Sequence, residues 1–274
     1  DTVRRQRQMC IRDRSKAISL VLAGGLIAAI LGPEVSRYSF DFFHDYIYLA
    51  TYLFAAIIQI INFVILIFIK IKKPQLSKKS HRPLSDILLQ KNLIIAILAA
   101  AVGYSLMSFI MTATPLQIVN VCKLGDSASA TVIQWHVIAM FAPSFFTGTI
   151  ISSLGNRKVM MIGLFLYAFS ISFTIIGQTI EHFWIALFLC GLGWNFLYVG
   201  GSDIIAKSAF PEERAKVQGV TDFIIFIFVA TGSFLAGALH SSLGWEIMMF
   251  YTSIPILILF VSIIIIKPDG IKAG

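Results

Sequence analysis

A chain of 274 residues with 57% hydrophobic and only 13% charged side chains has too little polar surface to enclose a core in water. Its net charge of +8 would suit nucleic acid, but the sequence contains no soluble module with a basic face. The composition therefore excludes a water-soluble protein and a nucleic-acid partner. It predicts an integral membrane protein whose solvent is the lipid bilayer.

Eight apolar stretches follow one another along the chain. Each has about 20 residues or more, which lets a helix cross a hydrocarbon core about 30 Å thick. The stretches are apolar on nearly all sides, as helices surrounded by lipid are. We therefore predict an all-α integral membrane protein with about eight transmembrane helices, at 16–33, 46–70, 93–114, 130–152, 159–178, 183–206, 218–240 and 246–266.

The basic residues of the loops predict the orientation of these helices. If the first span starts in the cytoplasm, only Arg37 and Lys123 fall outside. The other basic residues then lie inside, near the start and at 70–91, 157–158, 207–216 and 267–272. Because short cytoplasmic loops carry an excess of Lys and Arg, this pattern places both ends of the chain in the cytoplasm. We expect a multi-pass protein of the bacterial inner (plasma) membrane.

Residues 1–14 have no apolar periodicity and directly precede the first span. Three interpretations are open: a cytoplasmic tail, the charged start of a signal peptide, or sequence that is not native to the gene. The signal peptide is disfavoured because the following apolar run ends at Gly32, Pro33 and Glu34 without a clear small-residue cleavage site.

The longest polar segment separates two spans from six. Residues 70–91 carry seven basic residues against the single acidic residue Asp86, which suits both an inner linker and a loop close to anionic lipid headgroups. Many transporters have two bundles of six helices with the substrate between them, and on that plan four helices precede the first span here. We expect an N-terminally truncated chain with this organisation: the last two helices of the N-terminal bundle at 15–70, a central cytoplasmic loop at 71–92, a C-terminal six-helix bundle at 93–266 and a cytoplasmic tail at 267–274.

Three short motifs agree with this plan in their order and spacing. The sequence LGNRK at 154–158 follows the span 130–152, and PEER at 211–214 follows the span 183–206. The first span is rich in glycine and ends in proline, from Gly24-Gly25 to Gly32-Pro33. Together these motifs resemble those of the major facilitator superfamily of secondary transporters. LGNRK is similar to the weaker copy of that family's Gly-x-x-x-Asp-Arg-x-Gly-Arg-type signature, with Asn156 where an acidic residue is often found.

The resemblance implies the fifth to twelfth helices of a twelve-helix bundle that acts as a monomer when full length. Two longer strings, 134–148 and 193–201, resemble a bacterial branch that includes riboflavin importers, although related members carry other solutes. The implied function is secondary active transport of a small organic solute by alternating access, as a uniporter or a proton symporter. A facilitative channel and a membrane receptor or sensor are the alternatives.

Charged residues on two inner loops are candidates for a gate. They can pair when the inner mouth of a transporter closes and separate when it opens. The alternative is that they are solvated anchors of the topology, since an exposed ion pair contributes only about 0–1 kcal/mol. The candidate gating and loop-motif residues are Gly155, Arg157, Lys158, Glu213 and Arg214.

Polar groups at the mid-depth of three spans are candidates for solute binding, because they are costly against lipid. Helical spacing places them on mostly apolar faces, which suits a small, partly aromatic molecule. The alternative for each residue is packing or a hydrogen bond between helices. The candidates are Tyr104, Ser108, His136, Trp194, Asn195 and Tyr198.

Two ionisable residues within the spans are candidates for proton coupling. Asp222 and His136 could each hold or release a proton as their surroundings change. Asp222 lies one turn into its span, so pairing with Lys216 or helix capping is the alternative for it. His136 lies near the outer end of its span, where water could reach it.

Several sequence signatures of other functions are absent. The chain has no Gly-x-x-x-x-Gly-Lys-Ser/Thr loop for ATP, and neither His-Glu-x-x-His nor Gly-x-Ser-x-Gly. Cys10, Cys122 and Cys190 lie in different regions and suit neither a disulfide framework nor a metal cluster. We expect no enzyme activity, no catalytic residue, no metal and no cofactor.

Overall fold

The computed structural model describes residues 24–39, 42–43, 45–46, 48–69, 82–210 and 212–266, and every regular element within these ranges is a helix. The chain forms two compact units. One is Ile27–Lys79, and the other comprises Asp1–Leu26 together with Ser80–Gly274. Residues 1–14, most of the central loop and the tail at 267–274 lie outside the described residues, as does Cys10.

The smaller unit contains two apolar helices. The first is described over 24–39, of which 27–39 belong to this unit, so only the second half of the predicted span 16–33 can be followed. The second helix, α2 (Leu49–Phe68), has no buried residue and is mostly apolar, as expected for a helix in contact with lipid, although it carries Gln59 and Asn62. The hydroxyl oxygens of Ser39 and Thr51, 2.8 Å apart, form a hydrogen bond between the two helices.

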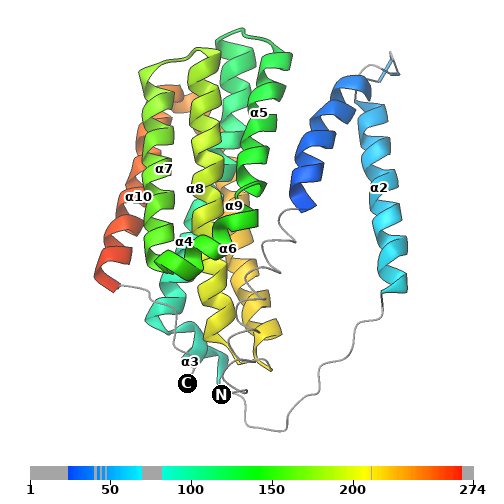
Figure 1. Cartoon of the computed structure of the whole chain (residues 1–274). Helices are drawn as coiled ribbons and strands as arrows, with labels where there is room; N and C mark the ends of the chain where they lie inside the picture. Colours follow the sequence, from blue (N-terminus) through cyan, green and yellow to red (C-terminus); the bar gives the residue numbers. More distant parts are fainter. Residues whose placement is uncertain are drawn as a thin grey trace. The chain divides into compact units, whose positions relative to one another are not determined.

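The larger unit is a helical bundle (Figure 1). Its elements are α3 (Leu84–Leu88), α4 (Lys91–Pro115), the π-helical turn η1 (Leu116–Val121), α5 (Asp126–Phe141), α6 (Ser144–Leu154), α7 (Asn156–Ile176), α8 (Ile180–Ser208), α9 (Arg214–Leu243) and α10 (Trp245–Ile266).

The helices of the described residues confirm the predicted all-α membrane fold. Six of them are long and apolar enough to cross a membrane, and the pair α5 and α6 makes a seventh if it is counted as one span. The predicted helix 130–152 is not continuous, because α5 and α6 meet at an angle of 43°. Pro143 lies at this break, and a proline cannot donate the hydrogen bond that would continue the helix.

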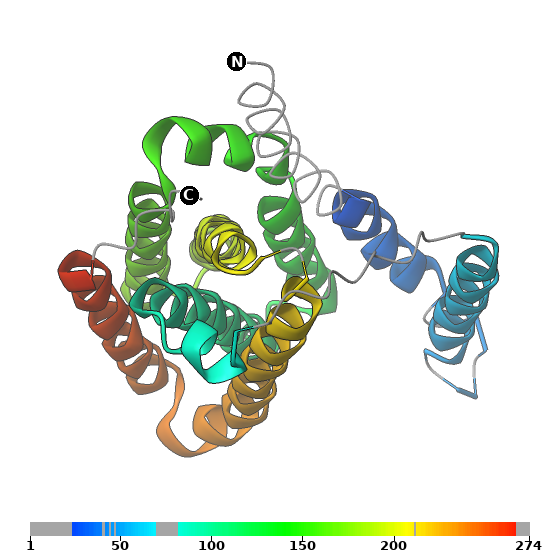
Figure 2. The same ribbon diagram turned by 90° about the horizontal axis from the view of Figure 1, so that it is seen from below.

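Helix α8 passes through the middle of the bundle, with α4, α5, α6 and α7 around it (Figure 2). Glycines let its backbone approach these neighbours closely. A Cβ atom on Gly191 would lie 2.6 Å from the carbonyl oxygen of His136, and one on Gly193 would lie 2.9 Å from that of Gly163. Without a hydrophobic force between helices in lipid, such close backbone packing is a main source of cohesion.

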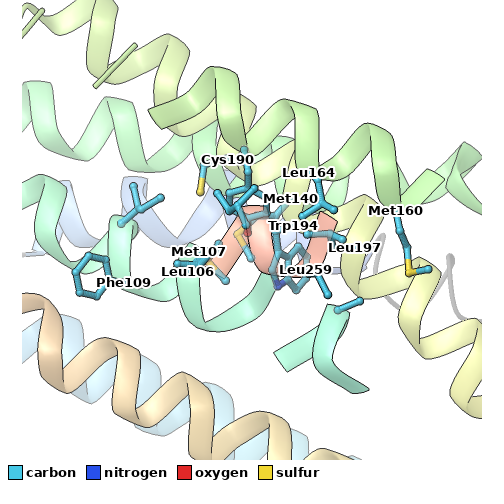
Figure 3. Packing of buried hydrophobic residues seen from close by; sticks show 14 of the residues in the cluster. Leu106, Met107, Phe109, Met140, Met160, Leu164, Cys190, Trp194, Leu197 and Leu259 are labelled. Carbon is cyan, nitrogen blue, oxygen red and sulfur yellow. The ribbon is translucent and has the colours of Figure 1, made fainter. Parts of the chain in front are cut away.

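The apolar core of the bundle is built around α8 (Figure 3). Trp194 and Leu197 of this helix are 2% and 1% exposed. Side chains from α4, α5 and α7 pack in the same cluster, among them Met107, Met140 and Leu164. The central position of α8 places its mid-depth side chains among four other helices, and there the candidate site lies.

Candidate functional site

Five aromatic side chains gather where α4, α5, α8 and α9 meet; we call them the aromatic cluster. Trp194 and Tyr198, one turn apart on α8, stack with ring centroids 5.0 Å apart and planes 8° apart. Tyr104 of α4 lies edge-on to both rings, at 5.2 and 5.5 Å. Phe141 of α5 contacts Trp194 at 5.8 Å, and Phe226 of α9 contacts Tyr104 at 6.0 Å. Such offset and edge-on pairs are the favourable geometries for aromatic rings.

The cluster is deep on one side and open on the other. Trp194 is 2% exposed, Tyr104 and Tyr198 are half-buried, and Phe226 is 55% exposed. The accessible part thus consists of Phe226 and parts of the two tyrosines, with the indole behind them. This is a surface suited to a flat, partly apolar molecule.

The indole of Trp194 is unusual because its polar atom is unused. Its Nε1 atom is buried and has no hydrogen-bond partner among the described residues. A buried donor without a partner loses its hydration and gains nothing in return, which costs about 1–3 kcal/mol. Trp245 and Tyr167 differ in this respect, since they donate to the carbonyl oxygens of Thr174 and Gly103 at 2.9 and 2.6 Å.

The side chain of Asn195 is fully used by the break between α5 and α6. Its Nδ2 atom donates to the carbonyl oxygen of Met140 and to Ser144 Oγ, both at 2.7 Å. Its Oδ1 atom accepts a hydrogen bond from Thr147 Oγ1 at 2.6 Å. Asn195 is 0% exposed, so it holds the two half-helices on either side of Pro143 in the interior of the bundle.

Ser108 likewise serves a contact between helices. Its hydroxyl lies 2.6 Å from that of Ser233 on α9. One turn earlier, Ser105 donates to the carbonyl oxygen of Phe228 at 2.7 Å. Gly232 brings the two helices together here, since a Cβ at this position would lie 2.5 Å from Ser105 Oγ. These bonds fasten α4 to α9 beside the aromatic cluster.

The two candidate proton carriers have different surroundings. His136 is 0% exposed, and its Nδ1 atom lies 2.7 Å from the carbonyl oxygen of Leu187. Because a carbonyl only accepts, Nδ1 carries the hydrogen, and Nε2 is a buried acceptor without a partner among the described residues. Asp222 is half-buried, accepts a hydrogen bond from Gln218 at 2.7 Å and lies one turn before Phe226 of the aromatic cluster.

The loop after α6 contains the first group of predicted gating residues. Gly155 has a φ of +83°, a conformation that suits glycine. Arg157 donates to the carbonyl oxygen of Ile264 in α10 at 3.4 Å, and Lys158 lies in the first turn of α7. The interior contact at this end comes instead from their neighbour Asn156, which donates to Asp203 Oδ2 at 2.8 Å. Asp203 also forms an ion pair with Lys207, one turn later on α8.

The second group of predicted gating residues, Glu213 and Arg214, lies beside Arg82, which the sequence analysis did not identify as a candidate. Glu213, just before Arg214 and α9, is 7% exposed and forms an ion pair with Arg82 at 2.7 Å. Arg82 donates to both carboxylate oxygens, through Nη2 and through Nε at 3.2 Å, and its guanidinium lies 4.4 Å above the centre of the Phe210 ring. These hydrogen bonds lower the pKa of Glu213 to about 2.

The ion pair fixes the end of the central loop to the turn between α8 and α9. Arg82 and Glu213 are 131 positions apart, so no local pattern could have joined them. Phe141 and Phe226 were also missed, because apolar aromatic residues in a span give the same signal whether they line a site or face lipid. Within the described ranges, no three His, Cys, Asp or Glu side chains are grouped so that they could hold a metal ion.

Comparisons with a family model and with known proteins indicate the same family. The model of the Major Facilitator Superfamily matches residues 118–272. The riboflavin transporter RfnT of Brucella anthropi is 39% identical over 265 residues, which cover 95% of this chain and 66% of that protein. Two MFS-type transporters of Bacillus subtilis, described as uncharacterized, are similar as well: YdeG is 35% identical over 54% of this chain and 35% of its own length, and YddS is 27% identical over 84% and 58%. The chain thus spans two thirds or less of the length of these relatives.

Proposed function

Because this chain belongs to the Major Facilitator Superfamily, we propose that it acts in secondary transport of a small, flat aromatic solute of the riboflavin type, by alternating access. The aromatic cluster carries this proposal. It lies at mid-depth, it is open on one side, and its members come from four helices. The similarity to a protein named as a riboflavin transporter supports the same class of solute.

The proposed organisation follows the two-bundle plan of such transporters. Residues 93–266 would form the C-terminal bundle, 15–70 the last two helices of the N-terminal bundle, and 71–92 the cytoplasmic loop between the bundles. The solute path would then run along the side of the C-terminal bundle on which Tyr104, Tyr198 and Phe226 are accessible. The positive loops support an orientation with both ends of this chain in the cytoplasm of a bacterial cell, and we propose a monomer in the plasma membrane.

Within the aromatic cluster, Tyr104 and Tyr198 are proposed to contact the solute, with Trp194 behind them. Asn195 and Ser108 are proposed to act indirectly, because their hydrogen bonds already connect helices that carry the cluster. Asn195 positions the half-helices α5 and α6, and Ser108 positions α4 against α9.

For proton coupling, Asp222 is better placed than His136. Its carboxylate is half-buried and lies one turn before Phe226 on the same face of α9, so a change in its protonation would be felt at the aromatic cluster. His136 is sealed between α5 and α8, where a second proton would create a buried charge without a partner. If the protein is a proton symporter, Asp222→Asn should abolish accumulation of the solute against its concentration gradient. If it is a uniporter, the same change should leave uptake of the solute unaltered.

At the inner end, Gly155, Arg157, Lys158, Glu213 and Arg214 are proposed to form part of the gate. The ion pair of Glu213 with Arg82 supports this role, because it connects the turn between α8 and α9 to the segment that enters α4.

Uptake of radiolabelled riboflavin by bacteria without their own flavin uptake tests the proposed function. The protein is expressed from its complete reading frame, and we expect saturable uptake. Tyr104→Ala and Tyr198→Ala should each raise the KM by about tenfold, since an aromatic contact of about 1.4 kcal/mol corresponds to that factor. Phe169→Ala is the control, because Phe169 is 58% exposed on α7 and outside the cluster. Uptake that rises linearly with concentration would indicate a channel and contradict the proposal.

A further inference from the structure

The unpaired indole N–H of Trp194 is the one feature of the aromatic cluster that a packing role does not explain. Buried indole and phenol groups elsewhere in the bundle find acceptors, as Trp245 and Tyr167 do. Phenylalanine would fill a purely apolar position without leaving a donor unpaired. A tryptophan with a buried, unused donor therefore points to an acceptor that is supplied from outside the described chain.

The surroundings of the N–H limit what that acceptor can be. The rings around Trp194 are those of Tyr104, Phe141 and Tyr198, which are all uncharged. The acidic residue beside the cluster is Asp222, which lies one turn before Phe226 on the same face of α9. An anionic solute would be repelled by this carboxylate and would lose its hydration among apolar rings. The site thus favours an uncharged acceptor on a planar conjugated ring.

We propose that the N–H of Trp194 donates a hydrogen bond to a carbonyl oxygen on the ring of an uncharged, planar heteroaromatic solute. This inference rests on the proposed function and adds to it a specificity-determining residue. The N–H lies in the plane of the indole, so the carbonyl approaches the edge of the ring, and the side chains that bury this edge move aside as the solute binds. The phosphate ester of the same ring system is excluded by its charge.

Trp194→Phe tests the role of the N–H, because it keeps an aromatic ring and removes only the donor and part of the ring. We expect the KM for riboflavin to rise by about tenfold with kcat little changed, the size of effect for one neutral hydrogen bond. The thermal midpoint should fall moderately, because the smaller ring leaves a cavity in the core, although no hydrogen bond of the folded chain is lost. Unchanged KM would overturn the inference.

A pair of competitors makes the readout specific to the hydrogen bond. Fluorenone and fluorene have the same planar ring system and differ by one carbonyl group. Wild type should bind fluorenone about tenfold more tightly, as measured by inhibition of riboflavin uptake, and Trp194→Phe should remove this preference. Riboflavin 5′-phosphate should compete poorly with both proteins. A preference that survives the substitution, or a phosphate ester that competes as well as riboflavin, would contradict the proposal.

Trp245→Phe is the matched control. It removes an indole N–H that donates to Thr174, so it should lower the thermal midpoint and leave the preference for fluorenone intact. If Trp194→Phe does not fold, incorporation of β-(3-benzothienyl)alanine at position 194 replaces the N–H by sulfur at nearly the same volume. Wild type that shows no flavin uptake would refute the proposed function itself. Flavin uptake with unaltered ring selectivity in the variant would refute only the role of the N–H.

Discussion

Trp194 and Asn195 are consecutive residues of α8, and their side chains have opposite relations to the protein around them. The amide of Asn195 makes three hydrogen bonds, which hold α5 and α6 at their break. The indole of Trp194 lies among rings and leaves its donor unused. The satisfied amide of Asn195 belongs to the architecture, whereas the unpaired N–H of Trp194, beside the accessible rings of the cluster, is available for a solute. Trp194 and Asn195 have the same depth along α8, so depth does not distinguish their roles. The hydrogen bonds that each side chain makes do distinguish them.

The largest expected effect is on the Asn195 side of this comparison. Asn195→Leu removes the amide from the break and leaves the carbonyl of Met140 and the hydroxyl of Ser144 without this partner. We expect a loss of about 2–4 kcal/mol of stability, because several buried polar groups lose a bond at once. A thermal melt followed by size-exclusion chromatography would show it as a clearly lower midpoint and less folded protein.

The control for this change is Ser241→Ala, which removes only a bond within α9 and should leave the melt unaltered. A folded, wild-type-like Asn195→Leu protein that has lost only uptake would reverse the comparison. Asn195 would then belong with Trp194 on the side of the solute.

Packing on the same side of α8 gives an intermediate effect. A Cβ on Gly191 would lie 2.6 Å from the carbonyl oxygen of His136, so Gly191→Ala must push α5 away from α8. We expect a loss of about 1–3 kcal/mol, typical of overpacking. Gly237→Ala is the matched control, because nothing lies within 4 Å of its added methyl group, and alanine in a helix should stabilise by up to about 1 kcal/mol. Equal melting of the two variants would show that this interface is not tightly packed.

The smallest effect is expected at the inner end, where the polar contact is charged and partly exposed. Glu213→Gln breaks the ion pair with Arg82, whose side chain is 38% exposed. Water already screens the arginine, so we expect a loss of about 1 kcal/mol or less. The neighbouring, exposed Glu212 provides the control Glu212→Gln, which should not change the thermal midpoint.

The pH dependence of this difference identifies the ion pair. The pKa of Glu213 is lowered from 4.5 to about 2 by the hydrogen bond from Arg82. A lowered carboxyl pKa means that the ionised form is favoured by folding, so the stabilisation is complete above pH 4.5 and is lost as the pH falls towards 2. The difference in midpoint between wild type and Glu213→Gln should therefore be constant from neutral pH to about 5 and shrink below it. A difference that grows on acidification would contradict this assignment.

Local properties of the sequence were sufficient to predict the class of fold. Hydropathy over about 20 residues locates a span, because a helix satisfies its own backbone in lipid and needs only apolar side chains outside. The same principle predicted Tyr104, Trp194 and Tyr198 as members of one site, since helical spacing and depth are both local. It could not separate them from Ser108 and Asn195, whose side chains also form hydrogen bonds and lie at a similar depth along their helices.

Contacts between distant segments were decided only by packing. Pro143 was visible in the sequence. The angle between α5 and α6, and the hydrogen bonds of Asn195 to the residues around it, depend on how closely α5, α6 and α8 approach. The pairing of Arg82 with Glu213 depends on two loops meeting across 131 positions of the chain. Apolarity and charge are properties of single residues and can be read in order, whereas a hydrogen bond requires two groups at a set distance and angle. That requirement is why the unused N–H of Trp194 became evident only from the folded bundle.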